Sequence, residues 1–507
     1  MNAMKKKKIG MALLIGGLGI LCGCGASAVN GKSADQIKVS EVQAGASVHD
    51  PTLVMGEDGT YYLFGSHMEA AKSTDLQHFT SFASGVNGSN PLFDNLFDEK
   101  KEAFSFTGKN VDGGYAVWAP DVIYNESMKK WVMYFSTSYD YRTSNICMAT
   151  ADTIEGPYTY QKTILYSGFT TQTIQNTNLY EVLGEHADVS RYLSANGYQN
   201  LLYPNCIDPT VFYDKDGKMW MSYGSWSGGI FLLEMDQETG LPIYPIASKD
   251  KETDPYYGTY LIGGMHASCE GSFIEYCEET GYYYLFVSYG QLVANGGYQI
   301  REFRSKEVSG PYLDASGETF ERTSNQEEVG VKLIGNYQLP NLKTACLSPG
   351  HCSVFVKDDK TIYLAYHQRF DNGTEYHEPR VHQMFMNKEG WLVVAPFATS
   401  TESLSDKGYQ EKEVAGKYYY VNHGTDISDT IVEAEELILK KDGSIIKGET
   451  KIGTYATDDE KPFITLEIDS IVYQGVIVEM LDDASNETLS FTAIGTNNES
   501  IWGVLYR

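Results

Sequence analysis

Basic residues are scarce in this chain. Lys and Arg number 39 among 507 residues, against 67 Asp and Glu, which gives a formal net charge of −28. A protein that binds nucleic acid needs a basic surface for the phosphates. We therefore expect no nucleic acid among its partners. The acidity by itself identifies no other partner and says little about the fold.

Long apolar runs are missing after the N-terminus. Residues 9–21 are apolar but too short to span a bilayer comfortably, and they follow the lysine run 5–8, as in a signal peptide. The segment ends in Leu21-Cys22-Gly23-Cys24, which resembles a bacterial lipobox. The resemblance predicts a signal peptide over residues 1–24 and an extracytoplasmic protein, lipid-anchored to the membrane or cell surface through Cys24. An ordinary secretion signal is the alternative.

Cysteine is also sparse, with eight in the chain and two of these in the signal. Export permits disulfides, but six cysteines allow 15 pairings. Cys346 with Cys352, or Cys269 with Cys277, are candidate local bridges, and buried free thiols are an equal alternative. The spacings do not match a zinc site.

Aromatic residues, in contrast, are abundant, and Tyr alone contributes 38. Such residues favour strands and also stack against sugar rings. Many fall in a pattern that occurs five times: a Pro or Gly beside an acid or His, an apolar strand, a polar turn and an aromatic strand. The copies are residues 49–66, 119–136, 207–224, 270–288 and 349–367.

Each copy has the signals of a β-hairpin, and radial repetition of such units gives a β-propeller. We expect an all-β protein with a five-bladed propeller over residues 48–399, after a polar tether at 25–47. A β-sandwich with similar hairpins is the alternative. Residues 408–507 show alternating strand patterns and predict a second all-β domain, a small barrel or sandwich. The polar insertion at 169–203 is expected on the surface.

The first residues of the repeats should converge at one mouth of the central channel, although they are distant in sequence. They are Asp50, Asp121, Asp208, Glu270 and His351. Like charges so placed repel one another and raise at least one pKa. Glycoside hydrolysis needs such a set, with one carboxyl protonated to donate to the leaving oxygen and one ionised to activate water.

Several motifs in these repeats resemble glycoside hydrolase family 43, and most of all its endo-1,5-α-L-arabinanases. They are His49-Asp50-Pro51, Trp118-Ala119-Pro120-Asp121, Asn205-Cys206-Ile207-Asp208-Pro209, Gly224-Ser225-Trp226-Ser227-Gly228-Gly229 and Glu270-Gly271-Ser272-Phe273. The resemblance covers roughly residues 45–400. It implies a five-bladed propeller, an inverting mechanism and the plant polysaccharide arabinan as substrate. The Gly-Ser-Trp-Ser-Gly-Gly motif departs from the Gly-Ser-Phe-Trp-Gly-Gly often found in the family's arabinanases.

Roles carried over from the family make Asp50 the general base, Asp208 the pKa modulator and Glu270 the general acid. His351 matches a histidine that helps to hold one calcium ion on the propeller axis, largely through water. A structural axial histidine is the alternative, since calcium prefers oxygen ligands.

Substrate contacts are expected from five further residues near the mouth of the channel: Trp118, Asp121, Asn205, Ser225 and Trp226. Arg301 is expected either to reach the cleft or to pair structurally. An exo-acting α-L-arabinofuranosidase or β-xylosidase of the same fold is the alternative activity. A non-catalytic sugar-binding lipoprotein is disfavoured because all three catalytic carboxylates are present.

Overall fold

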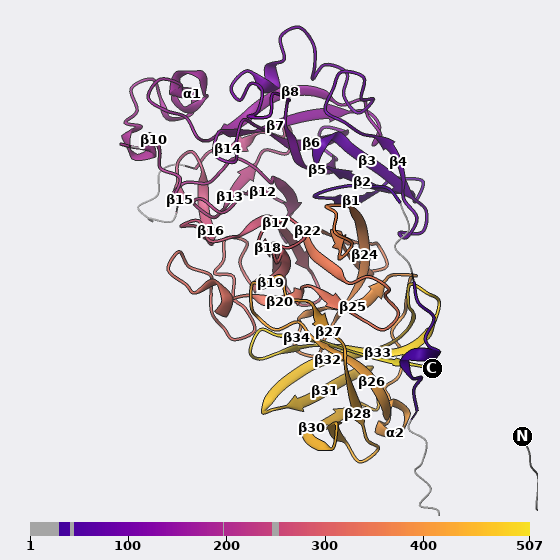
Figure 1. Cartoon of the computed structure of the whole chain (residues 1–507). Coiled ribbons are helices and arrows are strands. Elements are labelled where there is room, and N and C mark those ends of the chain that lie inside the picture. The colour runs from indigo at the N-terminus through magenta and orange to yellow at the C-terminus, as the bar shows by residue number, and fades with distance from the viewer. Residues whose placement is uncertain (1–29, 41–44, 196, 246–252) are drawn as a thin grey trace, which may run out of the picture.

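The computed structural model describes residues 30–40, 45–195, 197–245 and 253–507. The expected signal peptide and Cys24 lie outside these residues. Within them, no helix is long and apolar enough to cross a membrane. Figure 1 shows two bodies along the chain, a large one in indigo to orange and a smaller one in yellow.

The large body is the expected five-bladed propeller, and each blade has a core of four antiparallel strands. The first two blades are β1 (Thr52–Met55), β2 (Tyr61–Gly65), β3 (Glu69–Ser73) and β4 (Thr80–Ala83), then β5 (Val117–Asn125), β6 (Lys130–Ser138), β7 (Ser144–Ala151) and β8 (Thr159–Tyr166). The third is β11 (Thr210–Tyr213), β12 (Met219–Tyr223), β13 (Ile230–Met235) and β16 (Gly258–Ile262), with the short β14 (Pro242–Ile243) and β15 (Thr253–Asp254) at its outer side.

The last two blades complete the ring. They are β17 (Glu270–Cys277), β18 (Tyr282–Tyr289), β19 (Gln299–Ser305) and β20 (Val331–Ile334), then β22 (Cys346–Val356), β23 (Ile362–Phe370), β24 (His377–Met386) and β25 (Leu392–Ala398), with β21 (Tyr337–Gln338) beside β22. The innermost strands contact one another in the closed order β1, β5, β11, β17, β22 and back to β1. This closure brings the five repeats of the sequence to one axis.

Turn chemistry fixes the hairpins inside the blades. In the turn between β11 and β12, Gly217 has φ 76°, a conformation that glycine adopts without strain. Oδ1 of Asp214 accepts the backbone N–H groups of Asp216 and Lys218 there. The polar turn of this repeat, Asp214 to Gly217, therefore closes the hairpin as expected.

The smaller body is a closed eight-stranded barrel. Its strands are β26 (Gly416–Asn422), β28 (Glu435–Leu439), β29 (Ser444–Lys447), β30 (Thr450–Thr457), β31 (Phe463–Ile468), β32 (Ile471–Leu481), β33 (Glu487–Gly495) and β34 (Ser500–Tyr506). Apolar side chains such as Leu437, Leu466 and Phe491 fill its interior. A barrel of this size has room for packed side chains or a small ligand, and here the side chains occupy the space.

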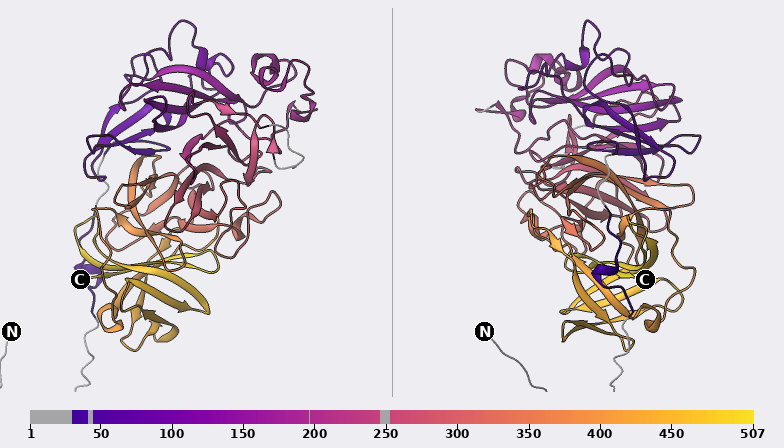
Figure 2. Two further views of the ribbon diagram at one scale, coloured as in Figure 1. Left: turned by 180° about the vertical axis from the view of Figure 1, so that it is seen from behind. Right: turned by 45° about the vertical axis from the view of Figure 1, so that its right-hand side comes forward.

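The barrel packs against the fifth blade, as both views in Figure 2 show. Trp502 is fully buried at this junction and meets Tyr337 edge-on at 5.1 Å between ring centroids. The short strand β27 (Val432–Glu433) also pairs with β21 of the propeller. The two bodies thus share one apolar cluster.

Among the residues that the structure describes, helix is confined to short pieces. They are α1 (Leu179–Leu183), α2 (Glu411–Val414), η1 (Ala34–Gln36), η2 (Ser66–Met68), η3 (Glu102–Phe104), η4 (Ile174–Asn176), η5 (Ser190–Tyr192) and η6 (Gln326–Glu328). Three of these lie in the insertion at 169–203, together with the hairpin β9 (Leu193–Ser194) and β10 (Gly197–Tyr198). The insertion is more than the surface loop we expected, because Phe169, Leu179 and Tyr192 are buried in the core of the second and third blades.

The six cysteines of the described residues are unpaired. Cys346 and Cys352 both lie on β22, whereas Cys269 directly precedes β17 and Cys277 ends it. At about 3.3 Å of rise per residue, separations of six and eight residues span roughly 20 and 26 Å along a straight strand. A disulfide needs Cα atoms within about 7 Å. Free thiols are therefore the alternative that the fold supports.

Candidate functional site

The backbone turns sharply where the chain enters the innermost strands. Asp50 and Asp208 have φ 52° and 55°, and each stands directly before a proline. Ala119 and Ser348 hold the same place before Pro120 and Pro349, with φ 38° and 46°. Non-glycine residues rarely adopt positive φ, and such positions cluster at functional sites.

A cavity of about 740 Å³ opens at this mouth of the propeller. It is lined by the three expected catalytic carboxylates and by most of the residues expected around them. The expected residues in the lining are Asp50, Trp118, Asn205, Asp208, Ser225, Trp226, Glu270 and His351. The propeller therefore brings together residues from all five repeats.

Asp121 is the expected cleft residue that does not line this cavity. It is 5% exposed, and its two oxygens accept hydrogen bonds from Oγ1 of Thr52 and the N–H of Val211, both at 2.7 Å. Asp121 follows its proline, as Thr52 follows Pro51, whereas Asp50 precedes Pro51. Counted from the proline of each repeat, Asp121 therefore lies two positions further along than Asp50. At that position its side chain is buried between the inner strands.

The Asp50 carboxylate is surrounded by imidazoles. Its oxygens lie 2.8 Å from Nδ1 of His49 and 3.2 Å from Nδ1 of His351, and Ser66 donates a hydrogen bond to Oδ2 at 2.5 Å. Burial would raise the pKa of Asp50, but the neighbouring His49 and His351 outweigh it and hold this pKa well below its usual range. Asp50 is thus ionised across the range in which proteins usually work.

Asp208 and Glu270 have the opposite tendency. Burial raises the pKa of Asp208 well above its usual range, and the charges of Glu270 and Asp50 add to the effect. Burial also raises the pKa of Glu270, although hydrogen bonds from Tyr298 at 2.8 Å and Ser225 at 3.1 Å oppose the rise. The two carboxyls titrate as a pair, and the cavity favours a proton on this pair.

Asn205 offers an unused amide to the cavity. It is fully buried, and neither its oxygen nor its nitrogen has a hydrogen-bond partner among the described residues. A buried amide without partners is costly, so we expect water or a bound ligand in the cavity to supply them. Trp118 and Trp226 add aromatic faces to the same lining.

Arg301 lies away from the cavity. Its side chain is fully buried and donates to Oε1 of Gln299 and to the carbonyl oxygens of Gly330 and Thr425. Thr425 belongs to the segment that follows β26, so Arg301 joins the propeller to the barrel. Of the two roles expected for it, the structural one fits these contacts.

Several residues that line the cavity were not predicted from the sequence. They are His49, Ser66, His67, Tyr141, Arg142, Ile207, His266 and Leu292. His49 stands next to Asp50 in the first repeat, which was a usable signal. The others come mostly from loops between strands, whose direction the repeat pattern does not fix.

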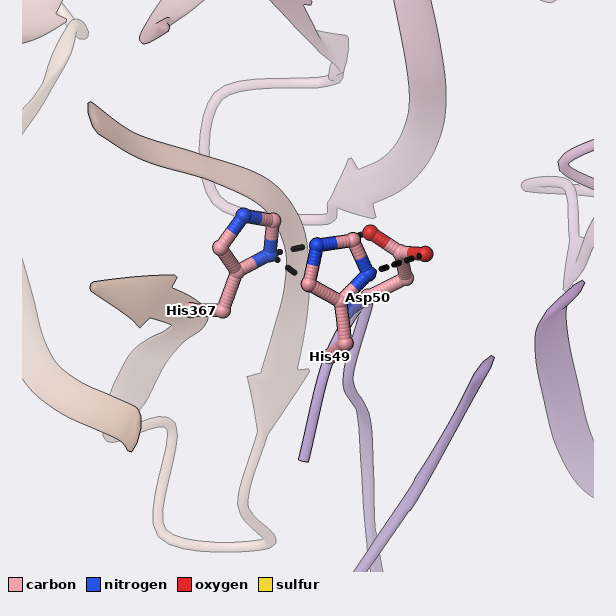
Figure 3. Close-up of side chains that lie close together, drawn as sticks. All are labelled: His49, Asp50 and His367. Atoms are coloured by element: carbon pink, nitrogen blue, oxygen red, sulfur yellow. Dashed lines mark hydrogen bonds and ion pairs between the residues drawn. The ribbon is translucent and has the colours of Figure 1, made fainter. Parts of the chain in front are cut away.

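A buried group of His49, Asp50 and His367 could hold a metal ion, since one ligand atom from each lies within 4.8 Å of the others (Figure 3). The group supplies two imidazole nitrogens and one carboxylate oxygen. Calcium takes six to eight oxygen ligands, so these side chains alone do not form a calcium cage. A calcium ion beside them would need water for most of its ligands, and the cavity along Asp50 and His351 has room for water.

Comparison with known families gives two matches. Residues 39–202 and 192–392 match Glycosyl hydrolases family 43, and residues 396–503 match a C-terminal lipocalin-like domain that accompanies this family. The first match covers the propeller strands up to the start of β25, and the second runs from the end of β25 through the barrel strands into β34.

Relatives match over almost the whole chain. An extracellular endo-α-(1→5)-L-arabinanase of Thermotoga petrophila is 35% identical over 90% of this chain and 93% of its own. Extracellular endo-α-(1→5)-L-arabinanase 2 of Bacillus subtilis is 38% identical over 90% and 92%. The crystal structure of endo-1,5-α-L-arabinanase from Thermotoga petrophila superposes with a TM-score of 0.77 at 33% identity, covering 93% of this chain and all of that one.

Proposed function

This chain belongs to glycosyl hydrolases family 43, and on that premise we propose that it cleaves internal α-1,5-L-arabinofuranosidic bonds of arabinan with inversion. One observation carries the proposal. A single cavity holds both an ionised carboxylate, Asp50, and a carboxyl pair, Asp208 and Glu270, that favours a proton. Acid–base hydrolysis of a glycosidic bond needs this division of roles.

In the proposed reaction, Asp50 acts as general base. It takes a proton from a water molecule, and the water oxygen attacks the anomeric carbon of an arabinofuranosyl unit. The bond between that carbon and the leaving oxygen breaks, and Glu270 gives its proton to the leaving oxygen. Attack from the side opposite the leaving group inverts the configuration. The leaving oxygen becomes a hydroxyl with the proton of Glu270, and the attacking oxygen keeps one water hydrogen as the new anomeric hydroxyl. The proton taken up by Asp50 passes to solvent, and Glu270 regains a proton from solvent before the next turnover.

Asp208 modulates the acid in this proposal. Its Oδ2 accepts the backbone N–H of Gly271 at 3.1 Å, which fixes the carboxyl beside Glu270. A negative charge there favours the protonated form of Glu270, because two adjacent carboxylates repel each other. Asp208 itself takes no part in bond making or breaking.

Binding of the sugar chain is assigned to the aromatic and amide groups of the lining. In the proposal, Trp118 and Trp226 stack against furanose rings, and the amide NH2 and oxygen of Asn205 donate to and accept from sugar hydroxyls. Ser225 bridges this region to the acid through its hydrogen bond to Glu270.

Calcium is the ion that we propose near the axis, held mainly through water beside Asp50 and His351. The nearby Asp208 and Glu270 carboxyls make the site attractive to a cation. The imidazoles of His49 and His367 suit a transition metal better than calcium. A bound transition metal would therefore indicate direct ligation by these imidazoles, and bound calcium would indicate ligation through water. No step of the reaction is assigned to the ion.

Export and lipidation at Cys24 complete the proposal. The relatives at 35% and 38% identity are named as extracellular enzymes, which agrees with an exported chain. Replacement of Cys24 by Ala should release the enzyme from membranes into the medium. If the variant stays membrane-bound, the lipid anchor is rejected.

The activity is tested by product sizing on linear arabinan, arabinoxylan and xylan. Early release of mixed oligosaccharides from arabinan supports endo action, whereas arabinose alone would indicate an exo-acting enzyme. Asp50→Asn and Glu270→Gln should each lower kcat by about 10²-fold or more, since general acid–base groups contribute about 10²–10⁴-fold. Unchanged kcat in either variant would reject the role assigned to that residue.

A further inference from the structure

Tyr298 contacts the proposed acid from inside the protein. It stands directly before β19 and is 1% exposed. Its hydroxyl donates a hydrogen bond of 2.8 Å to Oε1 of Glu270. The other carboxyl oxygen, Oε2, lies 3.1 Å from Oγ of Ser225, a residue of the cavity lining. The two oxygens of Glu270 therefore face different surroundings, one closed and one open.

The ring of Tyr298 is held firmly in this place. It stacks on the imidazole of His367, with centroids 5.7 Å apart and planes 20° from parallel. On another side it lies against Gly350 of β22, where an added Cβ would come within 2.1 Å of the ring. Only glycine at position 350 leaves room for the tyrosine, so the neighbouring fifth blade fixes the direction of its hydroxyl.

The phenol keeps its hydrogen in this setting. A tyrosine phenol ordinarily loses its hydrogen only at about pH 10, and the oxygen of Tyr298 lies 2.8 Å from Oε1 of Glu270. Tyr298 is thus a hydrogen-bond donor to Oε1. A protonated carboxyl carries a single hydrogen, and the oxygen that already accepts from the phenol is the poorer place for it.

We propose that Tyr298 is a positioning residue for the general acid, holding Oε1 of Glu270 so that the transferable proton resides on Oε2, at the cavity. The proposal rests on the acid role assigned to Glu270. Ser225 can accept the hydrogen of Oε2 before the substrate binds, because a hydroxyl both donates and accepts. When the glycosidic oxygen replaces Ser225 as acceptor, the proton moves from Oε2 to that oxygen as the sugar–oxygen bond breaks.

The test compares Tyr298→Phe with the natural enzyme on two kinds of substrate. Arabinan has a poor leaving group that needs the proton, whereas aryl glycosides of α-1,5-arabino-oligosaccharides release phenols that need little help. We expect Tyr298→Phe to lower kcat on arabinan on the order of 10-fold, with KM little changed, as part of the general-acid contribution. The loss should shrink to about 2-fold or less on aryl glycosides with acidic phenols.

Tyr289→Phe is the matched control. Tyr289 is also fully buried in the fourth blade, and its hydroxyl has no hydrogen-bond partner among the described residues. Its replacement should leave kcat unchanged on both kinds of substrate. An equal loss for Tyr298→Phe on arabinan and on aryl glycosides would assign Tyr298 a general structural role and overturn the proposal, as would no loss on arabinan.

Glu270→Gln separates this proposal from the proposed function. If Glu270 is the acid, this variant should show the same dependence on the leaving group, with a larger loss on arabinan. If Glu270→Gln keeps full activity on arabinan, the acid role itself fails, whatever Tyr298→Phe does. If Glu270→Gln behaves as expected and Tyr298→Phe does not, only the role of Tyr298 fails.

Discussion

Asp121 and Thr52 hold the same place in adjacent repeats, each directly after its proline, and they share a hydrogen bond of 2.7 Å between Oδ1 and Oγ1. The other carboxylate oxygen of Asp121 accepts the N–H of Val211 at 2.7 Å. One carboxylate thereby ties the inner strands of the first three blades together. Its role is to hold the ring on which the cavity is built.

Replacement of Asp121 by Asn should therefore lower stability more than chemistry. We expect a loss of about 1–3 kcal/mol in the free energy of unfolding, the usual cost of disturbing a buried hydrogen-bonded group. Denaturant unfolding measures this loss, with the exposed Asp216→Asn as control. A loss of activity in correctly folded Asp121→Asn, with unchanged stability, would return Asp121 to the substrate-binding set.

Asp121 should also make the free energy of unfolding depend on pH. Burial raises its pKa to about 6 in the folded protein, while hydrogen bonds from Val211 and Thr52 oppose the rise. The folded state then binds the proton more tightly than the unfolded state. The stabilisation of the folded state by the protonated Asp121 carboxyl is complete below about pH 4, and it is lost as pH rises through about 6. Unfolding curves of Asp121→Asn across this range should be flatter with pH than those of the natural protein.

Glu302 should give a similar effect at higher pH. It is fully buried, its Oε2 has no hydrogen-bond partner among the described residues, and burial raises its pKa to about 8. Stability from this group should fall as pH rises from about 4.5 to 8, because the charged form is disfavoured in the fold. Glu302→Gln should reduce the drop in unfolding temperature between pH 5 and pH 9. The exposed Glu307→Gln, in contrast, should reproduce the natural drop.

His266 is expected to affect binding of the sugar chain. It lines the cavity, and its Nε2 lies 3.2 Å from the amide nitrogen of Asn200, which comes from the insertion at 169–203. His266→Ala should raise KM for arabinan several-fold with kcat little changed. This is the expected effect of removing a contact that stabilises the bound substrate and the transition state equally. It should also shift the lengths of the early products. The exposed His186→Ala, in the same insertion, should change neither quantity, and a large fall in kcat for His266→Ala would point to chemistry instead.

Metal content tests the ion proposed near the axis. Elemental analysis of the purified enzyme should find about one calcium per chain, and a chelator should lower the unfolding temperature, because an ion bound only to the folded state stabilises it. Calcium should restore the original temperature, and zinc should not. Stoichiometric zinc or nickel would instead mean direct ligation by His49 and His367. No bound metal would leave His351 with a structural role.

Much of the site could be predicted from the sequence because the repeats are regular. The motif beginning at His49-Asp50-Pro51 recurs with its proline, strand and turn, and a closed ring is the arrangement that buries such hairpins without open edges. This was enough to expect Asp50, Asp208 and Glu270 in one cavity. Asp121 was placed wrongly because a shift of two positions along a bulged strand start is easily overlooked in the pattern, although counting from the proline reveals it.

Other features depend on side chains that no repeat pattern aligns. His367 lies at the end of the fifth repeat and comes within 3.6 Å of Asp50 only after the blades close. Tyr298 reaches Glu270 because Gly350, 52 places further along the sequence, leaves space for its ring. The cysteines are a similar case. Their spacing in the sequence allowed local disulfides, but the extended backbone of β17 and β22 keeps the two cysteines of each candidate pair apart.

The amino-acid sequence by itself determined the class of fold and the number of blades, and it predicted that Asp50, Asp208 and Glu270 share one cavity, since turn residues, strand alternation and repetition are local features that can be read along the chain. Only the tertiary structure decided which protonation each carboxyl favours. Burial and neighbouring charges set those pKa values: imidazoles around Asp50 hold it ionised, whereas burial and the nearby carboxylates favour one proton on the pair of Asp208 and Glu270. Such effects act through space between residues far apart in sequence, and they exist only once the ring has closed.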